Sequence, residues 1–189
     1  IPLDSSVTKT SGDVYNIDPF ITYLNPKNGD KHRLKTRYMK VINDNETKDN
    51  PNGQDNQSTT YYAEYQYQKN LESLGINWTS GIMNEYVDAV AELFNGTNYR
   101  LNNAVFTQLD KKLAKRINVS LGARYEQFLL RTSELYEIAG DSINSFNAAK
   151  PVFRAGINYQ LAEGTFLRSS WGQGYRFPSI AELFIETEV

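Results

Sequence analysis

A strict two-residue alternation of apolar and polar side chains is the feature that most constrains the fold of this chain. Residues 117–126 divide completely into an apolar set and a polar set: Ile117, Val119, Leu121, Ala123 and Tyr125, against Asn118, Ser120, Gly122, Arg124 and Glu126. Because successive side chains of a β-strand point to opposite faces of its sheet, such a strand has one apolar face and one polar face. The pattern predicts a sheet with one face against lipid or a core and the other against water.

Hydropathy and charge narrow the classes of protein further. The 189 residues contain no stretch that approaches the roughly 20 apolar residues of a transmembrane helix. A membrane-spanning barrel remains compatible with the mean hydropathy of −0.57, because alternation dilutes its apolar signal. The formal net charge of −2 indicates no nucleic-acid partner, and the absence of cysteine excludes disulfides and thiolate metal sites.

The same alternation recurs along the chain and predicts an all-β, antiparallel, up-and-down arrangement of about eight strands in four hairpins. Short turns are expected at 25–30, 70–73, 113–115 and 161–165, and longer connections at 43–58, around 95–97 and at 132–150. Short connections at one end and long ones at the other are typical of outer-membrane barrels. No domain boundary is visible, so residues 1–189 are predicted to form one partial β-barrel domain.

A strand expected over residues 14–24 contains Pro19, which favours the beginning or the edge of a strand there. The strand that follows places Arg33, Lys35 and Arg37 at alternate positions. Three successive basic side chains on one face cannot meet lipid or a dry core, so that face is predicted to be hydrated.

The C-terminal third carries a distinctive motif, Gly172-Gln173-Gly174-Tyr175-Arg176-Phe177-Pro178-Ser179-Ile180-Ala181-Glu182-Leu183-Phe184. It resembles the Gly-x-Gly-[Tyr/Phe]-Arg-x-Pro-Ser-x-Ala-Glu-Leu-[Phe/Tyr] segment in the barrel of TonB-dependent outer-membrane transporters. The segments at 18–26 and 109–126 are similar to the same family. The Asn-rich loops and Tyr-rich strands resemble its Bacteroidetes branch.

The resemblance implies a barrel of about 22 strands that is closed by an N-terminal plug domain. Such a transporter binds an extracellular ligand and releases it inward when TonB acts on the plug. The sequence shows neither a plug nor a TonB-interaction segment, so we expect a fragment of the barrel wall in the bacterial outer membrane. The implied cargo is a bulky, scarce nutrient such as a ferric chelate, a vitamin-like molecule, a glycan or a peptide. Neither a cofactor nor enzymatic activity is expected.

Within the motif, the residues expected to matter are Gly172, Gly174, Tyr175, Arg176, Pro178, Ser179, Glu182 and Leu183. The two glycines share the polar face with Arg176, and their missing side chains would let another element approach the wall closely. Pro178 is expected to end the strand and to begin a short helical segment at 179–184. Arg176 is the residue for which we expect a structural role.

The candidate lumen-facing residues are charged and lie on the polar face of the predicted strands: Arg33, Lys35, Arg37, Glu64, Arg124, Glu126, Arg154 and Arg168. They either line a substrate path and contact the plug, or form a hydrated wall with cross-strand ion pairs that each contribute little. The second interpretation is favoured for any single residue.

Two other functions stay open from the sequence. About eight strands can close into a complete small barrel with a structural or adhesive role. An outer-membrane barrel enzyme is a further alternative, although His32 as the single histidine gives little support to a catalytic pair.

Overall fold

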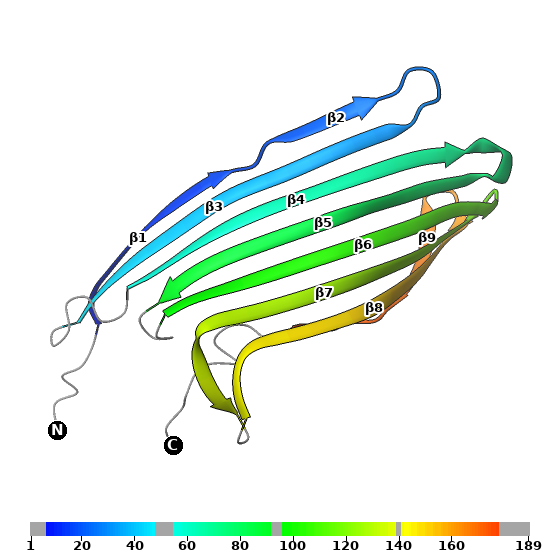
Figure 1. The fold of residues 1–189 in the computed structure, drawn as a ribbon. Coiled ribbons are helices and arrows are strands. Elements are labelled where there is room, and N and C mark those ends of the chain that lie inside the picture. Colours follow the sequence, from blue (N-terminus) through cyan, green and yellow to red (C-terminus); the bar gives the residue numbers. More distant parts are fainter. Residues whose placement is uncertain (1–6, 48–54, 92–95, 139–140, 178–189) are drawn as a thin grey trace.

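The computed structural model describes residues 7–47, 55–91, 96–138 and 141–177, which form one antiparallel sheet (Figure 1). Its strands are β1 (Val7–Ile17), β2 (Phe20–Leu24), β3 (Lys31–Thr47), β4 (Asn56–Leu71), β5 (Ile76–Ala91), β6 (Gly96–Ala114), β7 (Ile117–Ile138), β8 (Asp141–Ala162) and β9 (Thr165–Gly172). The sheet order is β1-β3-β4-β5-β6-β7-β8-β9, and β2 also pairs with β3. The predicted all-β, antiparallel, up-and-down fold is confirmed.

The prediction of about eight strands and the observed nine differ because one strand is interrupted. Both β1 and β2 pair with β3, through Ile17 opposite Tyr38 and Phe20 opposite Lys35. Between them lies Pro19, which has no N–H to donate to a ladder. Its carbonyl still accepts a 3.0 Å hydrogen bond from the Thr36 amide, so the two halves remain attached to the same neighbour.

Short turns join the strands at one end of the sheet. A single 3₁₀ turn, η1 (Glu72–Leu74), connects β4 to β5 and ends at Gly75, whose φ of 60° is accessible mainly to glycine. Gly164 has a φ of 76° in the turn between β8 and β9. In the β2–β3 connection, the side-chain amide of Asn28 donates a hydrogen bond to the Asp30 carboxylate at 2.8 Å.

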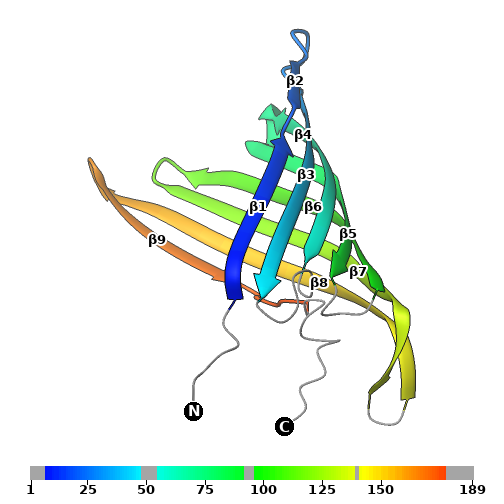
Figure 2. The same ribbon diagram turned by 90° about the vertical axis from the view of Figure 1, so that its left-hand side faces the viewer.

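At the opposite end the strands run further than predicted. The expected loop at 43–58 was too long, because Asn43 pairs with Asn56 and donates to its side chain at 2.8 Å. The expected connection at 132–150 was wrong, because β7 and β8 continue as a paired hairpin to Ile138 and Asp141. Figure 2 shows this hairpin extending past the neighbouring strands and bending, and the register shifts between Arg131 and Tyr136. Such irregularities bend a strand and increase its twist.

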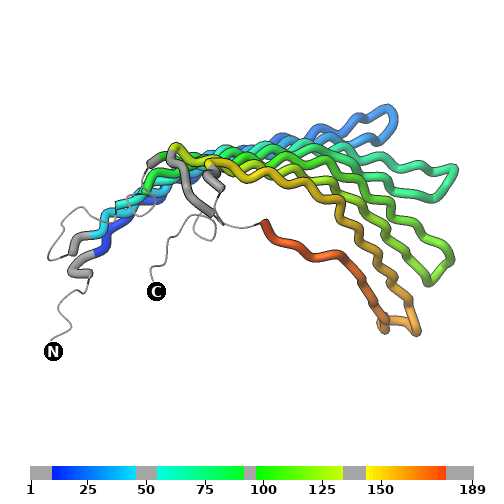
Figure 3. The backbone as a smooth tube through the Cα atoms, turned by 60° about the horizontal axis from the view of Figure 1, so that its bottom comes forward, coloured from blue at the N-terminus to red at the C-terminus, as the bar shows by residue number. Residues whose placement is uncertain are grey.

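The sheet is curved (Figure 3). The side chains on its two faces are buried to different degrees. Neighbouring residues on the paired strands β5 and β6 show this directly. Ile82 and Val105, which face each other, are 58% and 53% exposed. Met83 and Ala104, the next pair on the opposite face, are only 9% and 4% exposed. We assign the crowded set to the concave face, where side chains converge, and the exposed apolar set to the convex face.

A small apolar core lies on the concave face. Phe128 and Leu130 are buried there, and Phe146 packs against them from β8. The segment after β9 turns back over this face, so that the Phe177 ring stacks on Phe128 at 4.5 Å between centroids. The concave face is also the polar face of the alternation, because Phe128 lies in one cross-strand row with the polar residues Asn102 and Glu85.

Strands β1 and β9 lie at the two edges of the sheet in the described residues, and closure is not seen. The strands from β3 to β8 have 16 to 22 residues, more than the roughly 9–11 needed to cross the hydrocarbon of a bilayer. In the described part of the chain, no helix is long and apolar enough to cross a membrane.

Candidate functional site on the concave face

The concave face collects the charged side chains of the sheet. By cross-strand register, all the residues predicted to face a lumen lie on it: Arg33, Lys35, Arg37, Glu64, Arg124, Glu126, Arg154 and Arg168. The ladder places them on one face because residues directly opposite each other on antiparallel strands share a face. Among them, the ion pairs in the described residues are Lys35 with Glu64 and Arg124 with Glu126. That this face lines a lumen stays a prediction.

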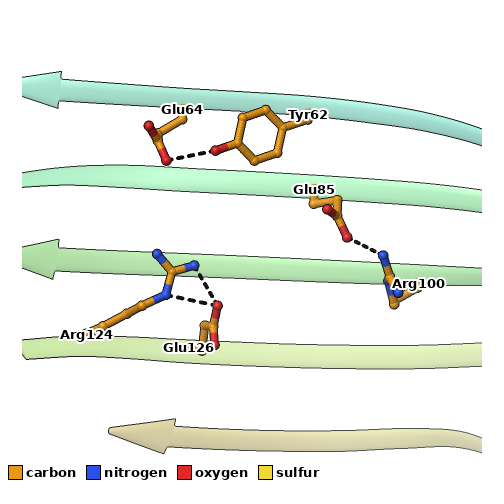
Figure 4. A network of polar contacts seen from close by, with 6 residues as sticks. All are labelled: Tyr62, Glu64, Glu85, Arg100, Arg124 and Glu126. Atoms are coloured by element: carbon orange, nitrogen blue, oxygen red, sulfur yellow. Dashed lines mark hydrogen bonds and ion pairs between the residues drawn. The ribbon is translucent and has the colours of Figure 1, made fainter. Parts of the chain in front are cut away.

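Glu64 is the centre of one polar cluster. Its carboxylate accepts a hydrogen bond from Tyr62 Oη at 2.7 Å (Figure 4). It also accepts from Lys35 Nζ at 3.1 Å and from Gln66 Nε2 at 3.0 Å. The Glu64 side chain is only 13% exposed, so these three donors replace the water that it would otherwise bind. Lys35 lies directly opposite Glu64, which explains the pairing.

Two further ion pairs lie on the neighbouring strands (Figure 4). Arg124 donates through Nε and Nη2 to one oxygen of Glu126, at 2.9 and 2.5 Å, and its guanidinium lies 5.8 Å from the Phe106 ring centroid. Arg100 on β6 pairs with Glu85 on β5. Arg100 was not predicted from the sequence, because β6 alternates less cleanly than its neighbours, although Arg100, Asn102 and Ala104 do share one face.

Arg37 is held by a residue at the Pro19 interruption. The Arg37 Nε and Nη2 groups donate to the two oxygens of Asp18 at 2.6 and 3.0 Å. Such bidentate pairs fix the orientation of the guanidinium. Asp18 was not predicted as a site residue, because its proximity to Arg37 depends on β1 and β2 sharing one neighbour.

A cavity of about 520 Å³ opens on the concave face beside these pairs. Its lining is mixed in charge and includes Asp18, Phe20, Arg33, Lys35, Arg37, Tyr62, Glu85 and Arg100. The Nε atoms of Arg33 and Arg100 are buried and have no hydrogen-bond partner among the described residues. Buried donors without partners are rare, so the cavity is suited to a carboxylate, phosphate or carbonyl oxygen from another element or from a ligand.

The cavity, the polar network and the open curved sheet agree with the outcome of a comparison with known families. The model of the family described as "TonB dependent receptor-like, beta-barrel" matches residues 4–187. The chain belongs to the TonB-dependent receptor family. The resemblance of the C-terminal motif is thereby confirmed at the level of the family, which is a family of outer-membrane transport receptors. No curated protein and no solved structure matched this receptor chain.

The start of the receptor's C-terminal motif lies against β8. Gly172 ends β9 opposite Arg154, and Gln173 exchanges two hydrogen bonds of 3.0 Å with the Phe153 backbone. Tyr175 packs edge-to-face on Phe177 at 4.9 Å. Since β9 ends at Gly172, the prediction that Pro178 ends this strand was wrong. Pro178, Ser179, Glu182 and Leu183 lie outside the described residues.

Close approach at glycine occurs at positions other than those predicted. A Cβ at Gly174 would meet no described atom within 4 Å, and one at Gly172 would make ordinary contact with Arg154 at 3.7 Å. The receptor instead uses Gly122, where a Cβ would lie 2.7 Å from Arg154 Nε, and Gly81, where it would lie 2.5 Å from the Phe106 ring. That Gly172 and Gly174 admit another element stays a prediction.

A last cluster involves Arg154, which donates to Gln108, and Asp110, which accepts from Ser120 and from Gln108. Gln108 and Asp110 were also missed from the sequence. In the described part of the receptor, no group of three or more His, Asp or Glu could hold a metal ion.

Proposed function

We propose that this receptor chain forms part of the wall of an outer-membrane transporter that imports a bulky, scarce nutrient: a ferric chelate, a vitamin-like molecule, a glycan or a peptide. The observation that carries the proposal is the opposition of two faces on one open sheet, together with membership of the family. The convex face suits lipid, and the concave face, with its paired charges and its cavity, suits a hydrated passage.

The sheet supports a large barrel more than a small one. A sheet edge exposed to lipid leaves backbone groups unsatisfied, so further strands must pair with β1 and β9 in a membrane. In the described residues these strands lie at opposite edges, whereas a small closed barrel would pair them with each other. We therefore propose that residues 1–189 are one part of a barrel of about 22 strands, of which the chain supplies roughly a third.

The transport cycle then requires two partners beyond the lipid bilayer. TonB acts through a plug domain that another segment of the protein supplies, and an extracellular ligand is the cargo. The unpartnered Nε atoms of Arg33 and Arg100 are the groups that we propose for contact with the plug or the ligand.

The test is energy-dependent uptake by the full-length receptor. A strain that lacks the parent gene is grown with one nutrient limiting at a time: iron chelates, vitamins, glycans or peptides. We expect one limitation to expose a growth defect that the wild-type gene repairs only when TonB is functional. Repair that is independent of TonB, or no defect under any limitation, would count against the proposal.

A paired variant examines the concave face itself. Arg33→Ala with Arg100→Ala should lower uptake while the barrel still assembles, because both changes remove polar groups from a hydrated surface. Asn118→Ala on the same face, near the short-turn end, is the control and should leave uptake unchanged. If the wild-type receptor, the double variant and the Asn118→Ala control all take up the nutrient equally, the cavity has no part in transport.

A further inference from the structure

A groove on the convex face carries polar groups that the transport proposal does not use. It has a volume of about 510 Å³, and its walls include Leu34, Tyr65, Ile82, Val105 and Tyr125. These five side chains form one row across β3 to β7, since each is paired with the next. On an outer-membrane barrel this surface would face hydrocarbon.

Three side-chain amides border the groove on one side. Asn84, Asn103 and Gln127 lie directly opposite one another on β5, β6 and β7. They are on the same face as the apolar row and two residues along the strands from it. The Asn84 amide donates to Asn103 Oδ1 at 2.7 Å. Neither the Gln127 amide nor Asn103 Nδ2 has a hydrogen-bond partner among the described residues. A polar group in hydrocarbon without a partner is costly, so these amides call for an external one.

The depth of the amides indicates the chemistry of that partner. The next row beyond them contains Tyr38, Tyr61 and Tyr86, whose neighbouring ring centroids are 5.5 and 6.3 Å apart. Tyrosine rows of this kind mark a membrane interface. Two residues along a tilted strand put the amides about 5 Å inside that interface. The linkage between the headgroup and the acyl chains of a lipid lies at this boundary, and it offers carbonyl or hydroxyl groups.

A cation lies on the headgroup side of the same groove. Arg131 is exposed on the convex face of β7, four residues beyond Gln127, and donates to Tyr99 Oη at 3.1 Å. Along β7 this face therefore presents the Arg131 cation, Leu129, the Gln127 amide and then the apolar side chains of Tyr125, Ala123 and Leu121. The order matches an anionic headgroup, a carbonyl linkage and an acyl chain.

We propose that the convex groove binds an acyl chain of a phosphorylated glycolipid of the outer leaflet, with a carbonyl or hydroxyl on the Asn103 and Gln127 amides and a phosphate near Arg131. On β4 and β5 the tyrosine row lies nearer the end opposite the short turns, which in outer-membrane barrels is the extracellular end. This selects the outer leaflet, whose lipopolysaccharide anchor, lipid A, has this chemistry. The inference rests on the proposed outer-membrane location of the receptor.

The test measures lipid A that stays on the full-length receptor after purification from outer membranes in mild detergent. Lipid extracted from equal amounts of protein is quantified by mass spectrometry. Asn103→Leu with Gln127→Leu removes two hydrogen bonds and should lower retained lipid A about tenfold. Arg131→Gln should lower it about threefold. Asn147→Leu is the matched control, an exposed amide on the convex face in the row next to the amides but outside the groove, and should have no effect.

Barrel assembly is followed by the heat-dependent change of electrophoretic mobility, and leucine at a lipid-facing position should preserve it. An assembled double variant that retains as much lipid A as wild type overturns the inference, as does loss of phospholipid in place of lipid A. A wild-type dimer that the double variant no longer forms would assign the groove to a protein partner and overturn the inference as well. A receptor absent from outer membranes refutes the transport proposal itself, so the two failures are distinguishable.

Discussion

The concave and convex faces are made by the same strands, yet they handle polar groups in opposite ways. On the concave face the carboxylates of Glu64, Glu85 and Glu126 each have a cationic partner. On the convex face of β6, the residues from Leu101 to Leu109 are uncharged, and Asn103 is only partly satisfied. The difference is the one that a sheet with water on one side and lipid on the other requires, because a charge is costly where neither water nor protein can meet it.

The largest effect should come from placing a charge on the convex face. Leu121→Arg should impair assembly of the full-length barrel at a cost of at most about 2–4 kcal/mol, the range that arginine reaches at the bilayer midplane. Ser120→Arg places the same cation on the concave face beside Asp110 and should be mild. The measurement is the folded fraction in a urea titration, followed by heat-dependent mobility. Equal tolerance of the two variants would contradict the assignment of the faces.

A smaller effect should follow from filling space on the concave face. A Cβ at Gly81 would lie 2.4 Å from the Tyr65 carbonyl oxygen, so the backbone or the Phe106 ring must move. We expect Gly81→Ala to destabilise the barrel by about 1–3 kcal/mol, as overpacking does elsewhere. Gly156→Ala is the control on the same face, because its Cβ would make only 3.8 Å contacts. The urea midpoints of the two variants should differ, and coincident midpoints would mean that this face is looser than its contacts indicate.

The smallest effect should come from ion pairs within the concave face. Glu85→Gln leaves Arg100 without its carboxylate and should cost about 1 kcal/mol or less, since the pair is partly exposed. Asp18→Asn should cost still less, because Asp18 and Arg37 are 41% and 48% exposed. The free energy of unfolding of each variant is measured in low and in high salt, because salt screens the more exposed Asp18–Arg37 pair more strongly than the Glu85–Arg100 pair. A larger loss for Asp18→Asn would reverse the ranking of the two pairs.

The strands and their facing were predictable wherever alternation is strict. The two-residue period of a strand is enough to predict that Leu121 and Ser120 lie on opposite faces. The missing N–H of Pro19 is enough to predict an interruption there. The ends of β3 and β4 were missed because asparagine favours loops by composition, whereas here Asn43 and Asn56 bond to each other across the ladder.

The composition of the site was less predictable than the fold, for a physical reason. Which cation meets which carboxylate depends on register, and register is set by all the strands together. The pairing of Arg100 with Glu85 and the bond from Lys35 to Glu64 each join two strands, so local sequence does not contain them. Whether the concave residues contact a ligand or a plug stays a prediction.

The regular register of the central ladder has a consequence for the lifetime of its hydrogen bonds. The pairings of β2 with β3, β3 with β4, β4 with β5 and β5 with β6 contain no shift, whereas irregularities occur near Val7, Lys112, Arg131 and Gln160. Amide hydrogens in an unbroken ladder exchange with solvent only when several neighbours open together. Opening should therefore begin at the irregularities and reach the middle of β4 and β5 last, so that this part of the wall keeps its protons longest.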